Sequence, residues 1–160
     1  MFSFITAKLL VTTGYVSSGS SSTNSEIIDL ENPNSKCKNW ANYPINIGMA
    51  TGQVIGSNVI ICGGQWSGSY KSNCYKLGPK SAVSLPNLSI ARSSSSSGVF
   101  NSALFVTGGN DKFLNLYSTT DYISINERQT GVSMPIKLSA HCVIQVNANE
   151  ILLTGGSDEG

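Results

Sequence analysis

The 160-residue sequence is short of charge, with a charged fraction of 12% and a formal net charge of +1. Soluble proteins carry roughly 25% charged residues, about twice as much. No basic excess exists to neutralise phosphates, so electrostatic binding to nucleic acid is not expected. The composition also excludes a coiled coil, and no apolar run approaches the roughly 18 residues of a membrane span. The sequence therefore favours a soluble, near-neutral, β-rich protein and identifies no activity.

Catalytic motifs are missing as well. His141 is the only histidine, so a Ser-His-Asp arrangement would depend on it, and no GxSxG motif is present. The glycine-containing stretch from Gly14 has no phosphate-binding lysine. The four cysteines form no CxxC pair, so a structural zinc site has little support. We expect no enzyme, no metal and no cofactor.

The N-terminal segment is apolar but is a poor signal peptide. It lacks a basic start, and Lys8 interrupts the apolar stretch that such a peptide needs. A β-strand pair fits better, because Phe2 and Phe4 alternate with other residues and the apolar run 9–11 follows.

Three glycine doublets, each at the end of an apolar run, reveal an internal repeat. The runs are 59–64 (VIICGG), 104–109 (LFVTGG) and 151–156 (ILLTGG). A degenerate copy, 9–15 (LLVTTGY), has Tyr15 where the second glycine is expected. The first glycines are then Gly14, Gly63, Gly108 and Gly155, in steps of 49, 45 and 47 residues. Periods of this size are typical of propellers and solenoids.

Each period contains further strand-like segments. No segment has the 3.6-residue apolar period of a helix, so a helical solenoid is excluded. Four short strands per period, separated by glycine and proline, indicate a four-stranded propeller blade. The segments after each doublet are, in order, strand-like (26–30, 73–77, 121–125), proline-marked (43–45, 85–87, 134–136) and small or apolar (50–55, 92–100, 140–146).

These residues resemble the kelch repeat. The resemblance rests on the doublets, on the strands that carry Tyr75 or Tyr122, and on Trp40 four residues before a proline. The family's tryptophan is absent from the next two periods, where Ala82 and Gly131 stand in its place. The resemblance implies an all-β, kelch-type β-propeller fragment of about three four-stranded antiparallel blades. A closed kelch ring has about six blades, so the remaining blades are expected to be missing from this chain.

The repeat divides the chain into four parts. They are residues 1–57 (a first partial blade region), 58–101 (the second repeat), 102–148 (the third repeat) and 149–160 (the start of a fourth). Open strand edges are expected where blades are lacking.

Candidate binding residues follow from the alternation of strand direction. The loops after the doublets emerge on the same face as the links between blades, and similar kelch propellers bind peptides there. Two of these residues have alternative roles: Trp66 in packing over the neighbouring blade, and Arg92 in bonding loop carbonyls. The predicted partner-binding residues are Trp66, Tyr70, Arg92, Asp111, Lys112, Phe113 and His141. The predicted structural glycines, which allow close strand approach, are Gly63, Gly64, Gly108, Gly109, Gly155 and Gly156.

The cysteines offer one pairing. Cys62 ends one predicted strand and Cys74 begins the next strand of the same antiparallel pair, so a disulfide is within reach if the chain is secreted. We expect Cys37 and Cys142 to be free, buried thiols. Secreted kelch-like chains have a similar Cys-Gly-Gly…Cys-Tyr arrangement. This similarity slightly favours an extracellular location over a cytoplasmic one but does not decide between them.

The leading hypothesis for function is a non-enzymatic protein–protein interaction scaffold that binds a protein or peptide through the loop face. One alternative is part of a propeller enzyme similar to galactose oxidase or to sugar-acid isomerases. The galactose oxidase copper site needs at least two histidines, and this chain has one. A third hypothesis, a substrate adaptor of a ubiquitin ligase, requires a helical BTB-like domain upstream.

Overall fold

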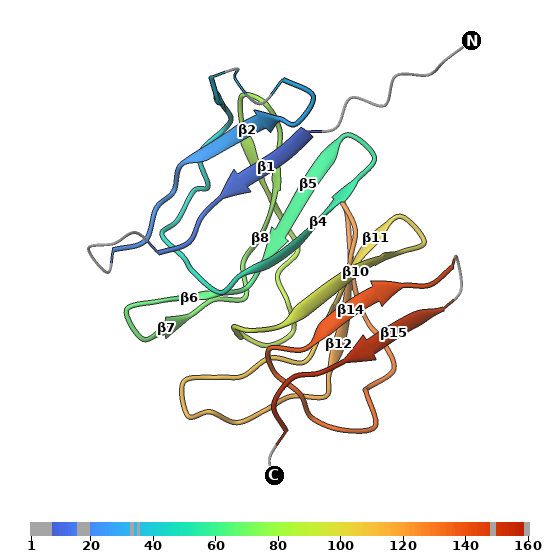
Figure 1. The fold of residues 1–160 in the computed structure, drawn as a ribbon. Helices are drawn as coiled ribbons and strands as arrows, with labels where there is room; N and C mark the ends of the chain where they lie inside the picture. The colour runs from blue at the N-terminus through green and yellow to red at the C-terminus, as the bar shows by residue number, and fades with distance from the viewer. Residues whose placement is uncertain (1–7, 16–19, 33, 35, 148–149, 159–160) are drawn as a thin grey trace.

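A computed structural model describes residues 8–15, 20–32, 34, 36–147 and 150–158 of the chain (Figure 1). These residues are all-β and contain no helix, and so none of them forms a helix able to cross a membrane. Phe2 and Phe4, predicted in an N-terminal strand pair, lie outside the described residues.

Within the described residues, thirteen strands form four successive antiparallel sheets, and a small hairpin projects from the second sheet. The first sheet has the order β1 (Lys8–Thr12), β2 (Ser25–Asp29), β3 (Lys38–Asn39). The second has β4 (Thr51–Ile55), β5 (Asn58–Cys62), β8 (Cys74–Leu77), β9 (Ala82–Leu85). The third has β10 (Ser96–Phe100), β11 (Ala103–Thr107), β12 (Thr120–Ile123), β13 (Arg128–Thr130). The fourth pairs β14 (Cys142–Gln145) with β15 (Ile151–Thr154), and the hairpin pairs β6 (Gln65–Trp66) with β7 (Ser69–Tyr70).

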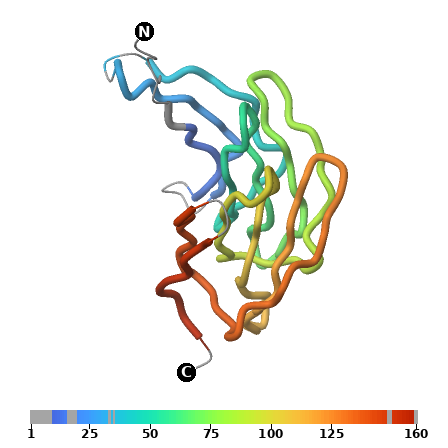
Figure 2. Tube along the Cα trace, turned by 90° about the vertical axis from the view of Figure 1, so that its right-hand side faces the viewer, coloured from blue at the N-terminus to red at the C-terminus, as the bar shows by residue number. Residues whose placement is uncertain are grey.

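The sheets follow one another along the chain, and each sheet is made of consecutive strands except where the hairpin intervenes (Figure 1). The side view has the first sheet in blue at the top and the fourth in red at the lower left (Figure 2). In the part of the chain that is described, the sheets do not close into a ring.

Backbone hydrogen bonds connect the segments that lead from one sheet into the next, which we call links. The Ser94 amide donates to the Met49 carbonyl at 3.1 Å, and the Ala140 amide donates to the Ser94 carbonyl at 2.8 Å. All three residues have a positive φ, between 52° and 54°, at the same place before β4, β10 and β14. These repeated bonds hold the three strands next to one another.

Apolar side chains fill the junction between the second and third sheets. Ile60 and Leu85 of the second sheet pack against Leu104, Val106 and Ile123 of the third, all of them buried. A second cluster of Tyr43, Ile47, Ile61 and Leu77, with Tyr43 packed edge-on to Tyr75, lies behind the second sheet. Burial of this apolar surface is the main stabilising contribution to the fold.

The strand register corrects the alignment of the first repeat. Thr13 and Gly14, with φ of 58° and 111°, match Gly63 and Gly64, with φ of 68° and 95°. The Gly14 amide, like that of Gly64, donates to a carbonyl in the link to the following sheet. Tyr15 therefore follows the doublet position and does not replace its second glycine. The sequence could not show this shift, because two consecutive threonines precede Gly14.

A second correction concerns the tyrosines of the third strands. Tyr75 pairs with Ile61, and the equivalent pair in the third sheet is Asp121 with Val106. Asp121 thus occupies the place of Tyr75, and Tyr122 lies one residue further on. The two tyrosines point to opposite sides of their sheets, because side chains alternate along a strand.

The proline-marked segments follow the fourth strands and do not form them. β9 ends at Leu85, before Pro86, and β13 ends at Thr130, before Pro135. The repeat 58–101 contains β5, β8 and β9 of the second sheet and β10 of the third. The sequence period is therefore offset by one strand from the sheet.

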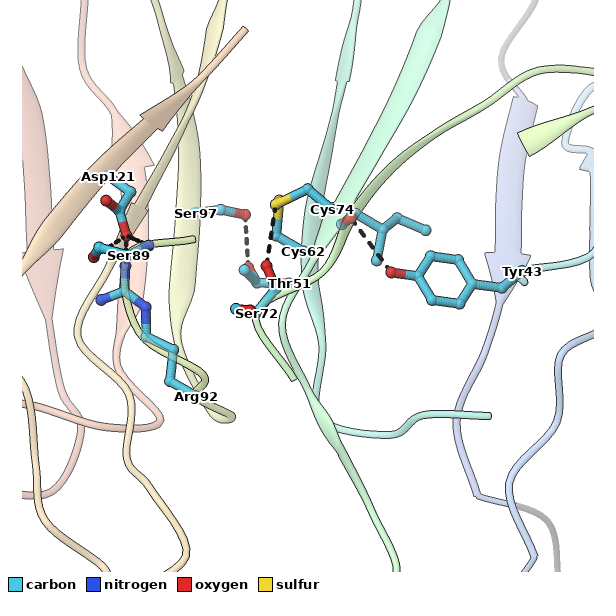
Figure 3. Close-up of a disulfide and its surroundings, with 10 residues drawn as sticks. Tyr43, Thr51, Cys62, Ser72, Cys74, Ser89, Arg92, Ser97 and Asp121 are labelled. Atoms are coloured by element: carbon cyan, nitrogen blue, oxygen red, sulfur yellow. Dashed lines mark hydrogen bonds and ion pairs between the residues drawn. A yellow bond between two sulfur atoms is a disulfide. The ribbon is translucent and has the colours of Figure 1, made fainter. Parts of the chain in front are cut away.

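Cys62 and Cys74, the pair that the sequence singled out, are opposite each other in β5 and β8 and are joined by a disulfide (Figure 3). Both residues are fully buried. Cys37 and Cys142 are free, as expected, but both are exposed. Our expectation of burial was wrong for both: Cys37 lies just before β3, and Cys142 is the first residue of β14.

The same position carries a hydroxyl pair in the two neighbouring sheets. Thr107 and Thr120 are within hydrogen-bond distance through Oγ1 atoms 3.3 Å apart, and Thr12 and Ser25 through hydroxyls 2.5 Å apart. In each sheet the pair joins the end of the second strand to the start of the third. All three sheets therefore have two small side chains that contact each other at this position, and in the second sheet the contact is a disulfide.

Replacing the disulfide with a threonine pair is predicted to preserve the fold. The Cys62→Ala/Cys74→Ala variant should lose about 2–4 kcal/mol of unfolding free energy, because the 12-residue separation is no longer cross-linked. Cys62→Thr/Cys74→Thr should lose less, because it recreates the hydroxyl pair of the third sheet. Urea denaturation of the two variants tests this order, and an alanine pair as stable as the native protein would contradict it.

Candidate functional site

The loops that follow the glycine doublets lie together around an open hollow of about 480 Å³. The β6–β7 hairpin supplies one wall, the loop from Asp111 to Phe113 the other, and Ala91 of the link into the third sheet contributes as well. Tyr70, Asp111, Lys112 and Phe113, four of the predicted binding residues, are among its lining residues. The alternation of strand direction thus brings two successive sheets' loops to one place.

Asp111 organises its loop. Its carboxylate accepts hydrogen bonds from the Phe113 amide (2.8 Å), the Asn115 amide (3.0 Å), the Asn115 side chain (2.9 Å) and the Tyr117 hydroxyl (3.1 Å). The Asn115 side chain contributes most to lowering the pKa of Asp111. A carboxylate with four donors fixes the loop conformation before any partner arrives.

The loop presents two apolar side chains to solvent. Phe113 is 72% exposed and Leu114 is 75% exposed, and Leu114 has a positive φ of 65°. The Lys112 ammonium lies 4.8 Å from the centre of the Phe113 ring. The sequence analysis overlooked Leu114, although the run Lys112-Phe113-Leu114 between polar loop residues is a usable signal.

Trp66 packs against the preceding sheet, one of the two roles that its position in the sequence allowed. Its ring is half-buried and lies against Tyr15 of the preceding sheet, with ring centres 6.0 Å apart. The Tyr15 ring in turn covers Gly48, where an added Cβ would meet it. Trp66 therefore supports the hairpin wall of the hollow from behind.

Arg92 is fully buried, which corrects its placement on the binding face. Its guanidinium forms an ion pair with Asp121 at 2.5 Å (Figure 3). The guanidinium also donates to the carbonyls of Gly108 and Thr119. Asp121 also accepts two hydrogen bonds from Ser89. Arg92 thus bonds loop carbonyls, the second of the two roles that its sequence position allowed, and it ties the link to the interior of the third sheet.

Removal of one member of this ion pair is predicted to destabilise the protein strongly. Asp121→Ala leaves the buried guanidinium of Arg92 without a counter-charge and should lower the unfolding free energy by about 3–5 kcal/mol. Arg92→Met/Asp121→Leu should cost less, because no buried charge remains. Urea denaturation measures both, with Arg128→Met on an exposed strand as the control. An Asp121→Ala effect no larger than that of Arg128→Met would contradict the assignment.

His141 is also inside the protein and is only 7% exposed, so it too leaves the predicted binding face. Neither ring nitrogen has a hydrogen-bond partner among the described residues. The ring lies close to Gly108, and the Cβ of His141 lies close to Gly156, so that added Cβ atoms at these glycines would meet them. Burial lowers the pKa of His141, because the charged imidazolium is poorly solvated there.

Acidification is therefore predicted to destabilise the fold through His141. The unfolded chain takes up the proton near the ordinary pKa of about 6.5, and the folded chain only at lower pH. The unfolding free energy should fall as the pH drops through that value. Urea denaturation between pH 7.5 and 5.5 measures the slope, and His141→Gln should flatten it. Since the chain has one histidine, an unchanged slope in the variant would rule out this cause.

A second, smaller hollow of about 260 Å³ lies at the opposite end of the third sheet. Phe100 and Tyr122, with ring centres 5.9 Å apart, form part of its lining. The sequence analysis did not identify it. Among the described residues, no three His, Cys, Asp or Glu side chains gather in a way that would hold a metal ion.

Comparison of the chain with models of known protein families and with curated proteins finds no match. The resemblance to kelch repeats therefore depends on the sequence motifs alone.

Proposed function

We propose that the chain is an arc of a kelch-type propeller that binds a protein or peptide through the hollow between the β6–β7 hairpin and the Asp111 loop. Four features support the arc: the four-stranded order of two sheets, the consecutive arrangement of the sheets, the repeated bonds between their links, and the doublet geometry. The second and third sheets bury apolar side chains against each other, as neighbouring blades of a propeller do.

The observation that carries the binding role is the exposed Phe113–Leu114 tip on a loop fixed by Asp111. Aromatic side chains are frequent anchors at interfaces, and a loop that is already ordered loses little conformational entropy on binding. Tyr70 across the hollow supplies a second aromatic surface. Exposed loops on a rigid sheet scaffold are a common basis for recognition.

A non-enzymatic role is supported by the chemistry of the lining. The titratable side chains around the hollow are those of Tyr70, Asp111 and Lys112. Asp111 already uses its carboxylate in four hydrogen bonds, so it is poorly placed to act as a base. The hollow thus offers no paired acid and base for proton transfer.

Cross-linking at the loop tip tests this function. A photo-reactive benzoylphenylalanine at position 113 should cross-link one protein of the source organism's extract, whereas the same group at Ile125 should not. Ile125 is a matched control, since it is 54% exposed and lies in the turn after β12, at the opposite end of the sheet.

The affinity of the purified partner then decides the role of the tip. Phe113→Ala/Leu114→Ala should weaken binding by about 30-fold or more, as interface anchors do, while Ile125→Ala leaves it unchanged. The urea midpoint of all variants should stay the same, because these side chains are exposed. Equal cross-linking at both positions, or unchanged affinity of the double variant, would refute the proposal.

A further inference from the structure

The link between the second and third sheets begins directly after β9 with the segment Pro86-Asn87-Leu88-Ser89. Asn87, Leu88 and Ser89 form an Asn-x-Ser tripeptide, the sequence that N-glycosylating enzymes recognise. The chain has 15 asparagines, and none of the others is followed two residues later by serine or threonine. A tripeptide of this kind arises readily by chance, so its surroundings in the fold decide whether it can carry a glycan.

The Asn87 side chain is exposed, while buried residues on both sides of it hold the segment in place. Leu85 is 6% exposed and Leu88 is 3% exposed, and both pack in the apolar cluster at the junction of the two sheets. The Leu88 amide also donates to the Ser72 carbonyl at 2.8 Å. Residues 36–147 are described without a gap, so both sheets that flank the link are described in full. A fixed backbone thus holds Asn87 at the surface, where a glycan extends into solvent.

Ser89 ties the other end of the tripeptide to the third sheet. Its amide and its hydroxyl both donate to the Asp121 carboxylate, at 3.1 and 2.8 Å (Figure 3). The hydroxyl that a glycosylating enzyme has to recognise is therefore engaged in the folded protein. This contact indicates that a sugar is added before the link folds.

The disulfide supplies the second observation. Cys62 and Cys74 are joined across β5 and β8 of the sheet that precedes the link, and both are fully buried. Disulfides form and persist in oxidising compartments, and the Asn-x-Ser tripeptide is an acceptor in secreted chains. Two independent features of the chain thus point to the same compartment.

We propose that Asn87 carries an N-linked glycan. The donor is an oligosaccharide that is joined to a lipid through pyrophosphate. The side-chain nitrogen of Asn87 attacks the anomeric carbon of the first sugar, so that a C–N bond forms and the bond from that carbon to the pyrophosphate oxygen breaks. The lipid pyrophosphate leaves, and the amide proton passes to a base of the transferase. This site does not depend on the binding function of the loop face, so either proposal can fail alone.

The protein purified from its source tests the site directly. Digestion with a peptide-N-glycosidase in heavy-oxygen water converts a glycosylated asparagine into aspartate that carries the heavy isotope. Tandem mass spectrometry then locates the label. The label should appear at Asn87 and at none of the other asparagines.

Expression of the whole chain through the secretory pathway of eukaryotic cells allows matched variants to be compared. Asn87→Gln and Ser89→Ala should lose the gel-mobility shift that the glycosidase removes, whereas Ser89→Thr should keep it. Asn126→Gln, at an exposed asparagine in the turn after β12, is the control and should also keep it. After deglycosylation, Asn87→Gln should leave the urea midpoint unchanged, because the side chain is exposed. Ser89→Ala should lower the midpoint, because the hydroxyl bond to Asp121 is lost.

Two outcomes would overturn the proposal. The first is a source protein in which Asn87 carries no glycan, whatever the state of Cys62 and Cys74. The second is a native chain without a glycosidase-sensitive shift in the secretory pathway, or a shift that persists in Asn87→Gln.

Discussion

The arrangement depends on the close approach of backbone at the glycine doublets. An added Cβ at Gly64 would lie 2.7 Å from the Gly48 carbonyl, and one at Gly156 would lie 2.7 Å from the Ser139 carbonyl. These positive-φ residues let the chain leave the second strand while it bonds to the link of its own sheet and to the link that follows. At Gly64, Gly109 and Gly156 a side chain does not fit, whereas at Gly14 an added Cβ would meet nothing within 4 Å and only the positive φ of 111° favours glycine.

The same geometry determines where a binding surface can form. Because each doublet turns the chain back over a link, the loop after it lies above the start of the next sheet. The hairpin with Tyr70 and the loop with Asp111 consequently face each other across Ala91. The small lining residues of the hairpin leave the space open, and the Asp111 carboxylate keeps the opposite loop in place. The hollow is thus a product of the repeat, while its chemistry comes from loop residues that differ between repeats.

The repeat made much of the fold predictable, because the doublets mark strand ends directly. The all-β class, the second and third strands, the Cys62–Cys74 opposition and the common location of Tyr70 with Phe113 all follow from it. The strand register and the burial of individual side chains could not be predicted from the repeat. Arg92 was assigned to the binding face from the alternation of strand direction, and only the tertiary structure places Asp121 beside it. His141 is buried without any hydrogen-bond partner in the described residues, and no local sequence signal indicates such a site.

Equivalent positions in the sheets show why the repeats are alike in backbone but not interchangeable. The link carbonyls that accept from Gly14, Gly64 and Gly109 belong to Ile47, Arg92 and Leu138. In the second sheet Ile47 packs in an apolar cluster with Tyr75; in the third, Arg92 pairs with Asp121 at the position of Tyr75. Exchange of a single member would bury a charge against an apolar side chain, at a cost of several kcal/mol. The two residues of each pair therefore have to match: Ile47 with Tyr75 in the second sheet, and Arg92 with Asp121 in the third.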